Sequence, residues 1–163
     1  MKQDITEKKQ GIDLSMYDSI VIKKHITDIE GGRTLDMTGY PLDVLYAGHV
    51  IISKTTTEAG VTTKTYAPMP LVPVTETTGE GQNAVTTNVT DADGNIVYQY
   101  GTLPQGAVYE GVLYRSILKD KPAASILIDG VVNDKVMKYE LGAIASAFKT
   151  ACPHIIFNHD EEA

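Results

Sequence analysis

The chain has 163 residues, a length that suits one domain with its own hydrophobic core. Its hydrophobic fraction of 42% and charged fraction of 21% are ordinary for a globular protein, which excludes fully disordered and collagen-like classes. The net charge is −7, and no Lys/Arg cluster is longer than the pairs at 8–9 and 23–24, so we expect no nucleic-acid partner. No apolar run approaches the ~18 residues of a membrane span, and the polar N-terminus lacks a signal-peptide core, so no membrane partner is expected either.

The sequence divides into an arm, a body and a tail. Residues 1–16 are too polar to bury and are predicted to form a flexible N-terminal arm. Residues 17–158 are predicted to form a single β-rich domain, in which 54–90 is a Thr/Pro-rich insertion. Residues 159–163 form an acidic tail.

Apolar and polar residues alternate through most of the body, which is the pattern of strands that bury one face. Val, Ile, Leu and Tyr dominate the apolar set, with two Phe and no Trp, and this mix favours strands over helix bundles. The sequence therefore predicts a mainly β fold, with a β-sandwich, barrel-like or β-tulip-like body. The predicted strands are 17–26, 33–37, 44–53, 96–100, 107–118 and 124–132. Gly48, inside one of them, indicates a bulge or a close approach of another backbone.

One amphipathic helix is predicted near the C-terminus, over 134–151. Its apolar residues are spaced by three and four, as on one face of a helix: Met137, Leu141, Ile144, Ala145, Phe148 and Cys152. Asn133 or Asp134 is a suitable N-cap, and Pro153 ends the helix. Residues 154–157 could then return as a short strand.

The insertion at 54–90 is rich in Thr and contains Pro68, Pro70 and Pro73, which are incompatible with a regular central strand. We expect an exposed hairpin or long loop followed by an extended proline segment. Its hydroxyl-rich part is a candidate surface for an external partner. The residues of that candidate surface are Thr56, Thr57, Thr62, Thr63 and Tyr66.

The sequence gives little support for a catalytic or a metal-binding site. The segment Asp91–Asn95 resembles the start of a calcium loop, but a hairpin turn explains the same residues better. Cys152 is interpreted as a small buried apolar side chain, and the four histidines as ordinary surface or half-buried residues. The sequence contains no nucleophile elbow and no phosphate loop. We therefore expect no enzyme activity, no metal and no cofactor.

The segment from 103 to 133 resembles the C-terminal part of tailed-bacteriophage head-decoration and head-fibre proteins. The shared pattern is a Pro-x-Gly turn, a Gly-Val-Leu strand, a charged turn and a strand ending in Gly-x-Val-Asn. The matching residues are Pro104-Gln105-Gly106, Gly111-Val112-Leu113, Lys119-Asp120-Lys121 and Gly130-Val131-Val132-Asn133. The resemblance extends to about 33–53 and 101–157, whereas the insertion at 54–90 has no counterpart.

This resemblance implies an auxiliary capsid protein, made in the host bacterial cytoplasm, that binds the major capsid protein on the outside of the virion. It implies a homo-oligomer, most simply a trimer, without cofactor. An arm can add a strand to a capsid sheet edge, and the candidate capsid contacts are Ile12, Leu14, Met16 and Tyr17. Two alternatives stay open: the base of a head fibre or an exposed receptor- or glycan-binding module, and a small enzyme that uses Cys152.

Overall fold

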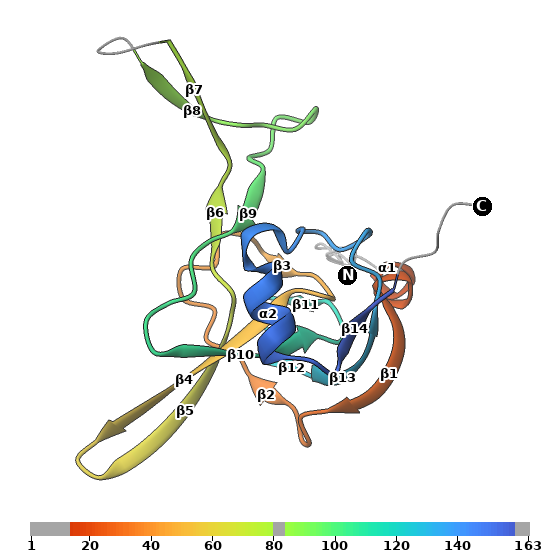
Figure 1. The fold of residues 1–163 in the computed structure, drawn as a ribbon. Helices are drawn as coiled ribbons and strands as arrows, with labels where there is room; N and C mark the ends of the chain where they lie inside the picture. Colours follow the sequence, from red (N-terminus) through yellow and green to blue (C-terminus); the bar gives the residue numbers. More distant parts are fainter. Residues whose placement is uncertain (1–13, 80–83, 159–163) are drawn as a thin grey trace, which may run out of the picture.

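The computed structural model describes residues 14–79 and 84–158. Its centre is a six-stranded sheet in the order β1-β13-β10-β4-β5, with β14 also paired to β13 (Figure 1). The bounds of these strands are β1 Ile22–Asp28, β4 Val50–Glu58, β5 Val61–Pro68, β10 Ala107–Leu113, β13 Ile126–Val132 and β14 Ile155–Phe157. The prediction of a mainly β body with a C-terminal helix is confirmed.

Strand β13 organises the sheet because it has three partners. Along one edge it pairs with β1, antiparallel. Along the other edge its first residues, 126–127, pair with β10, and its last, 130–132, pair with β14 in parallel. The short return strand predicted at 154–157 is therefore confirmed.

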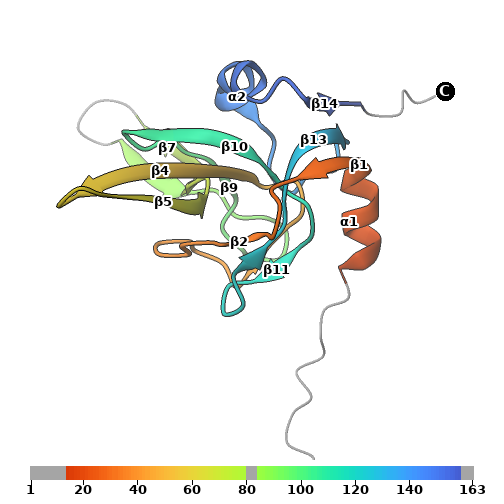
Figure 2. The same cartoon turned by 90° about the horizontal axis from the view of Figure 1, so that it is seen from below.

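Both faces of the sheet are covered, because alternate residues of each strand enter different cores. Val50 and Ile52 belong to the larger core, whereas Ile51 belongs to the smaller one. Figure 2 shows α2 on one side of the sheet and β2 and β11 on the other. The elements that cover the faces are the 3-10 helix η2 Gly142–Ile144, α2 Ala145–Ala151, β2 Arg33–Thr34, β3 Val44–Leu45, β11 Ile117–Leu118 and β12 Ala123–Ala124.

Gly48 makes the close approach that the sequence indicates, but in a turn and not within a strand. Its φ is +82°, and a Cβ there would lie 2.7 Å from Cγ1 of Val21. The strand predicted over 44–53 is wrong in this respect, since β3 ends at Leu45 and β4 begins at Val50. A tight turn that only glycine fits separates them.

Two hairpin structures project from the body (Figure 1). The β4–β5 hairpin extends two strands of the main sheet into solvent, so 54–68 is regular hairpin and not loop. The second projection, here called the distal arm, consists of β6 Leu71–Pro73, β7 Thr75–Thr78, β8 Val85–Asn88 and β9 Tyr98–Tyr100. Within it β6 pairs with β9 and β7 pairs with β8.

The first part of the strand predicted at 17–26 is wrong: it is helix α1, Ser15–Val21. The Asp18 carboxylate accepts hydrogen bonds from the backbone N–H (3.0 Å) and hydroxyl of Ser116, which attaches the helix to the body. Val21, at the helix end, is completely buried. Because 18 and 21 must both face the body, a period near four replaces the alternation of a strand.

The predicted C-terminal helix is too long. Residues 134–139 form turns and bends, 140–141 are irregular, and regular helix begins only at η2 and α2. Gly142 has φ +48°, which interrupts any helix entering from the preceding segment. Met137 and Tyr139 are buried by this irregular segment, so their burial needs no helical spacing. In the described part of the chain, no helix is long and apolar enough to cross a membrane.

Candidate functional site

Helix α1 presents an apolar face to solvent. Met16 is 76% exposed and Ile20, four residues later on the same side of the helix, is 51% exposed. Leu14, just before the helix, is half-buried. Of the predicted capsid contacts, Met16 is therefore available to a partner, whereas Ile12 lies outside the described residues.

Tyr17 lies in helix α1 and packs against the body, so only part of its side chain is open to an external partner. It is half-buried, and its ring meets that of Tyr46 edge-on at 5.5 Å between centroids. Its hydroxyl is buried without a hydrogen-bond partner among the described residues, and burial raises its pKa to about 12. Its side chain packs between α1 and the core.

At the β4–β5 hairpin, four of the five predicted surface residues are exposed: Thr56, Thr57, Thr62 and Thr63. They face one another in two cross-strand pairs, and the hydroxyls of Thr57 and Thr62 lie 3.1 Å apart. The hairpin therefore carries a regular array of hydroxyl and methyl groups.

Tyr66, the fifth predicted surface residue, is buried, and this part of the prediction is wrong. It belongs to the smaller core, with the Arg33 guanidinium 5.4 Å and the Lys64 ammonium 5.1 Å from its ring centroid. Lys64 also binds Glu110 at 2.6 Å, which raises the pKa of the ammonium. Ser53 donates to the same carboxylate at 2.5 Å. These contacts fix the root of the hairpin to β10.

Beyond that root, and apart from the contacts of Lys54 with Ala107 and of Lys64 with Glu110, the described residues of the β4–β5 hairpin pair only with each other. Residues 54–58 and 61–65 are all exposed, on both faces of the hairpin. The described residues of β7 and β8 are exposed throughout as well. Two-stranded hairpins alone in water are marginally stable, so such segments contribute little to the body and are suited to contact another molecule.

The exposed face of α1 and the hairpins lie at opposite ends of the body. Figures 1 and 2 both place α1 beside β1 and the tip of the β4–β5 hairpin at the far end of the sheet. The order of the sheet agrees, since β1 and β5 are its two edge strands. The protein thus exposes Met16 and Ile20 at one end, and the threonine pairs together with Val61 at the other.

The core holds a buried histidine, His49, which is 1% exposed. The expectation that it lies at the surface or is half-buried is therefore wrong. Its Nε2 donates to the carbonyl of Met69 at 3.0 Å, and its ring meets Tyr40, Tyr100 and Tyr139 edge-on within 5.7 Å. Burial lowers its pKa to about 4. His49 is therefore a neutral packing residue at physiological pH.

Cys152 is poorly suited to act as a nucleophile. It is 7% exposed, and burial, followed by the charge of Glu110, raises its pKa to about 11. A reactive cysteine needs the thiolate form, which a raised pKa suppresses. His154 is exposed, whereas Cys152 belongs to the larger core.

Ser125, Asp28 and His25 form a second group of potentially reactive side chains, but they are not arranged as a catalytic triad. The Ser125 hydroxyl donates to Asp28, and Nε2 of His25 lies 3.7 Å from the same carboxylate. In a catalytic triad the histidine stands between the hydroxyl and the acid, because it must take the proton. Here the acid stands between the other two, so these three residues do not form such a triad.

The segment Asp91–Asn95 is the turn that the sequence predicts. The backbone N–H of Gly94 donates to the Asp91 carbonyl at 3.1 Å, and Asp91 Oδ1 accepts from the backbone of Asp93 and Asn95. These bonds show that Asp91 Oδ1 stabilises the turn. Across residues 14–79 and 84–158, no group of three or more His, Cys, Asp or Glu is placed to hold a metal ion.

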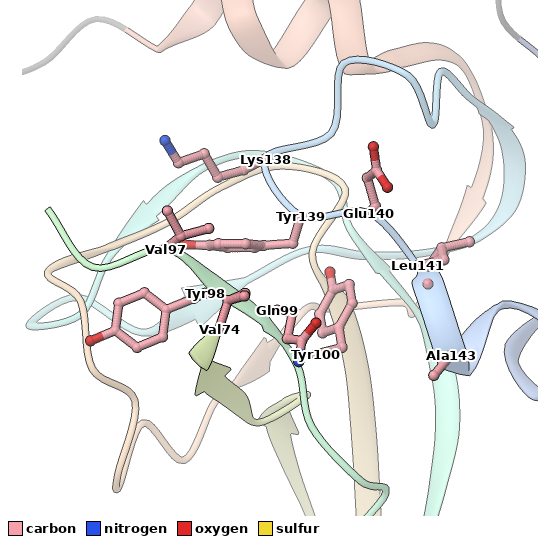
Figure 3. Close-up of a pocket in the computed structure, with 11 residues that line it drawn as sticks. Val74, Val97, Tyr98, Gln99, Tyr100, Lys138, Tyr139, Glu140, Leu141 and Ala143 are labelled. Carbon is pink, nitrogen blue, oxygen red and sulfur yellow. The ribbon is translucent and has the colours of Figure 1, made fainter. Parts of the chain in front are cut away.

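A hollow that the sequence did not suggest lies where the distal arm meets the body. Its volume is about 390 Å³, and its walls come from β9 and from the segment 138–143 (Figure 3). Tyr98, Tyr100 and Tyr139 supply aromatic walls, with Lys138 and Glu140 from the facing segment. Only the frequency of tyrosine in the sequence could have hinted at it, because its walls are distant in the chain.

Comparisons with protein-family models, with curated proteins and with solved structures found no match to this chain.

Proposed function

We propose that this chain is a structural virion protein that binds the outer capsid surface of a tailed bacteriophage and stabilises or decorates the head. The observation that supports the proposal most directly is the arrangement of two different exposed surfaces at opposite ends of one β-rich body. A protein that binds a capsid with one surface and faces the medium with another needs two such surfaces at opposite ends. The resemblance of 103–133 to head-decoration proteins supplies the identity of the shell.

The α1 end is the proposed capsid contact. Met16 and Ile20 expose apolar area at the point where the chain from the N-terminal segment enters the body. Burial of apolar surface contributes about 25 cal/mol per Å², so covering these side chains favours docking. The partner is the major capsid protein, and a trimer on a threefold junction is the proposed assembly.

The hairpin end is proposed to point away from the shell. The β4–β5 hairpin is exposed on both faces, which leaves its threonines free for the medium or for another virion component. The head-fibre alternative has the same orientation, and it differs only in the molecule that these threonines contact. We therefore expect capsid attachment to depend on α1 and not on the hairpin.

Co-sedimentation with purified capsids tests the orientation. We expect the double variant Met16→Ser, Ile20→Ser to lose attachment, and replacement of 56–63 by Asn-Gly to keep it. Val108→Ser is the matched control, because Val108 is 55% exposed but lies on β10. Each variant is also melted, to show that its fold is intact.

Two results would count against the proposal. Wild-type attachment of the α1 variant, with loss of attachment in the hairpin variant, would reverse the orientation. No attachment of wild-type protein to any capsid, or a strict monomer on the capsid by mass measurement, would remove the capsid or the trimer assignment respectively.

A further inference from the structure

A second hollow, which shares Lys138 and Tyr139 with the one in Figure 3, lies at the same junction between the distal arm and the body. Its volume is about 580 Å³, within the range of about 300–1,000 Å³ typical of small-molecule sites. It is lined by the turn 91–98 of the distal arm and by 42–46 of the body. Tyr98, Lys138 and Tyr139 line both hollows, and the two together are here called the arm cleft.

Tyrosine rings form the apolar walls of the arm cleft. Tyr98 is half-buried, so part of its ring is open to a ligand, whereas Tyr139 is buried. The Lys138 ammonium lies 5.5 Å from the centroid of the Tyr46 ring. Tyrosine combines an apolar ring with a polar hydroxyl, which suits ligands that are themselves apolar on one side and polar on the other.

The polar groups of the arm cleft are held in place before any ligand arrives. Asp91 Oδ1 accepts from the backbone N–H of Asp93 at 3.0 Å and of Asn95 at 2.9 Å. These bonds, chiefly that from Asn95, lower the pKa of Asp91, and the Lys138 charge acts in the same direction. The carboxylate, the Asn95 amide and the ammonium therefore offer acceptors and donors side by side.

The charges disfavour an anionic ligand. Lys138 is the one cation among the described residues that line the two hollows, and it stands against Asp43, Asp91 and Glu140. A phosphate or an acidic sugar would meet more negative than positive groups. Recognition of phosphates uses several cations or free backbone N–H groups.

An added peptide strand is also disfavoured, because the backbone here is already paired. The N–H of Val97 donates to the Val89 carbonyl at 2.9 Å, and the Val97 carbonyl accepts from Val74 at 2.8 Å. Strand addition needs an unpaired edge. Side chains must then carry the recognition.

We propose that the arm cleft binds a neutral oligosaccharide, whose C–H face stacks on Tyr98 and whose hydroxyls bind Asp91, Asn95 and Lys138. The Lys138 ammonium lies over the Tyr46 ring, so Tyr46 positions that ammonium and is not itself the stacking surface. This site differs from the threonine hairpin and needs no capsid. Its failure would leave the proposed capsid attachment untouched, and the reverse is also true.

Saturation-transfer difference NMR on the full chain tests the proposal. The probes are maltotriose, cellotriose, xylotriose and N,N′,N″-triacetylchitotriose, with sialyllactose and inorganic phosphate as the anionic arms. With ring-labelled tyrosine we expect at least one neutral trisaccharide to shift the Tyr98 resonance and to leave Tyr114, near α1, unchanged. This comparison in the wild-type protein requires no variant.

Variants then locate the site. We expect Tyr98→Ala and Lys138→Ala each to weaken binding roughly tenfold, which corresponds to about 1.4 kcal/mol, with Tyr114→Ala as the matched control. Lys138 is exposed, so its removal leaves the fold intact even if loss of Tyr98 disturbs β9. The proposal is wrong if none of the neutral probes binds, if only the anionic probes bind, or if Lys138→Ala binds like wild type.

Discussion

Phe148, at the centre of helix α2, is expected to be the side chain whose loss costs the body most. It is completely buried in the larger core. Its ring meets Tyr109 of β10 edge-on at 5.6 Å and Phe157 of β14 at 6.1 Å between centroids. Phe148→Ala would therefore open a cavity between α2, β10 and β14, the three elements that the ring holds together.

The size of the effect follows from these contacts. Removing a buried phenylalanine costs about 3–5 kcal/mol in other proteins, through lost transfer free energy and the cavity that remains. Two edge-on ring contacts place Phe148 toward the upper part of that range, because each such pair adds about 0.5–1.5 kcal/mol. For a chain of this length, each kcal/mol lowers Tm by roughly 2–4 °C. We expect a drop of roughly 8–20 °C.

Thermal melts and urea unfolding measure this directly. Ser146→Ala, on the exposed side of the same helix, is the matched control and should melt within about 0.5 kcal/mol of wild type. Phe148→Asp should be worse than Phe148→Ala, because it also buries a charge. A loss below about 1 kcal/mol in Phe148→Ala would show that α2 does not stabilise the sheet as described.

Three further outcomes can be checked on the isolated protein. Gly48→Ala should lower the free energy of unfolding, measured in urea, by about 2 kcal/mol or more. The added Cβ would lie 2.7 Å from Val21, and a φ of +82° disfavours any side chain, so equal stability would contradict this packing. His49, with a pKa lowered to about 4, is neutral when folded and gains a proton on unfolding, so the protein should lose on the order of 3 kcal/mol as the pH falls from 6.5 to 4. His49→Gln should remove that part of the pH dependence, and an unchanged profile would count against it. Cys152 should react with a thiol reagent slowly in the native state and rapidly in denaturant, and fast native labelling would show that the thiol is accessible.

Much of the sheet could be predicted because its strands are rich in Val and Ile, which favour strands. Leu113 and Val112, or Ile126 and Leu127, enter opposite cores, so these central strands bury both faces and read as continuous apolar runs, not as the alternation expected of strands that bury one face. Gly48 could be identified as a special backbone position, since an isolated glycine among apolar residues is conspicuous. The exposed threonines of the β4–β5 hairpin followed from composition.

Most of the failures share a physical cause, which is that tertiary contacts override local spacing. α1 is a different kind of failure, because its apolar residues fall at 16, 17, 20 and 21, a helical spacing that the predicted strand overlooked, and Asp18 then attaches the helix to Ser116. Met137 and Leu141 have helical spacing but reach the core from turns. Tyr66 looks like a surface residue of a threonine tract, yet the smaller core accepts its ring. The arm cleft was invisible because its walls meet only in three dimensions.

The pairing of β1 with β13 joins segments about 110 positions apart in the chain, since Ile22 pairs with Val132. The middle of the sheet cannot be completed until the last quarter of the polypeptide has been synthesised, and β14 then fills the remaining edge of β13. Folds dominated by such distant pairings form slowly, because the loop-closure entropy is lost before the contacts stabilise the chain. During synthesis the β4–β5 hairpin, whose partners are local, can form long before the body. Newly made chains therefore pass through a stage in which exposed hairpins precede the core, and truncation before β14 should leave residues 130–132 of β13 without a partner along one edge.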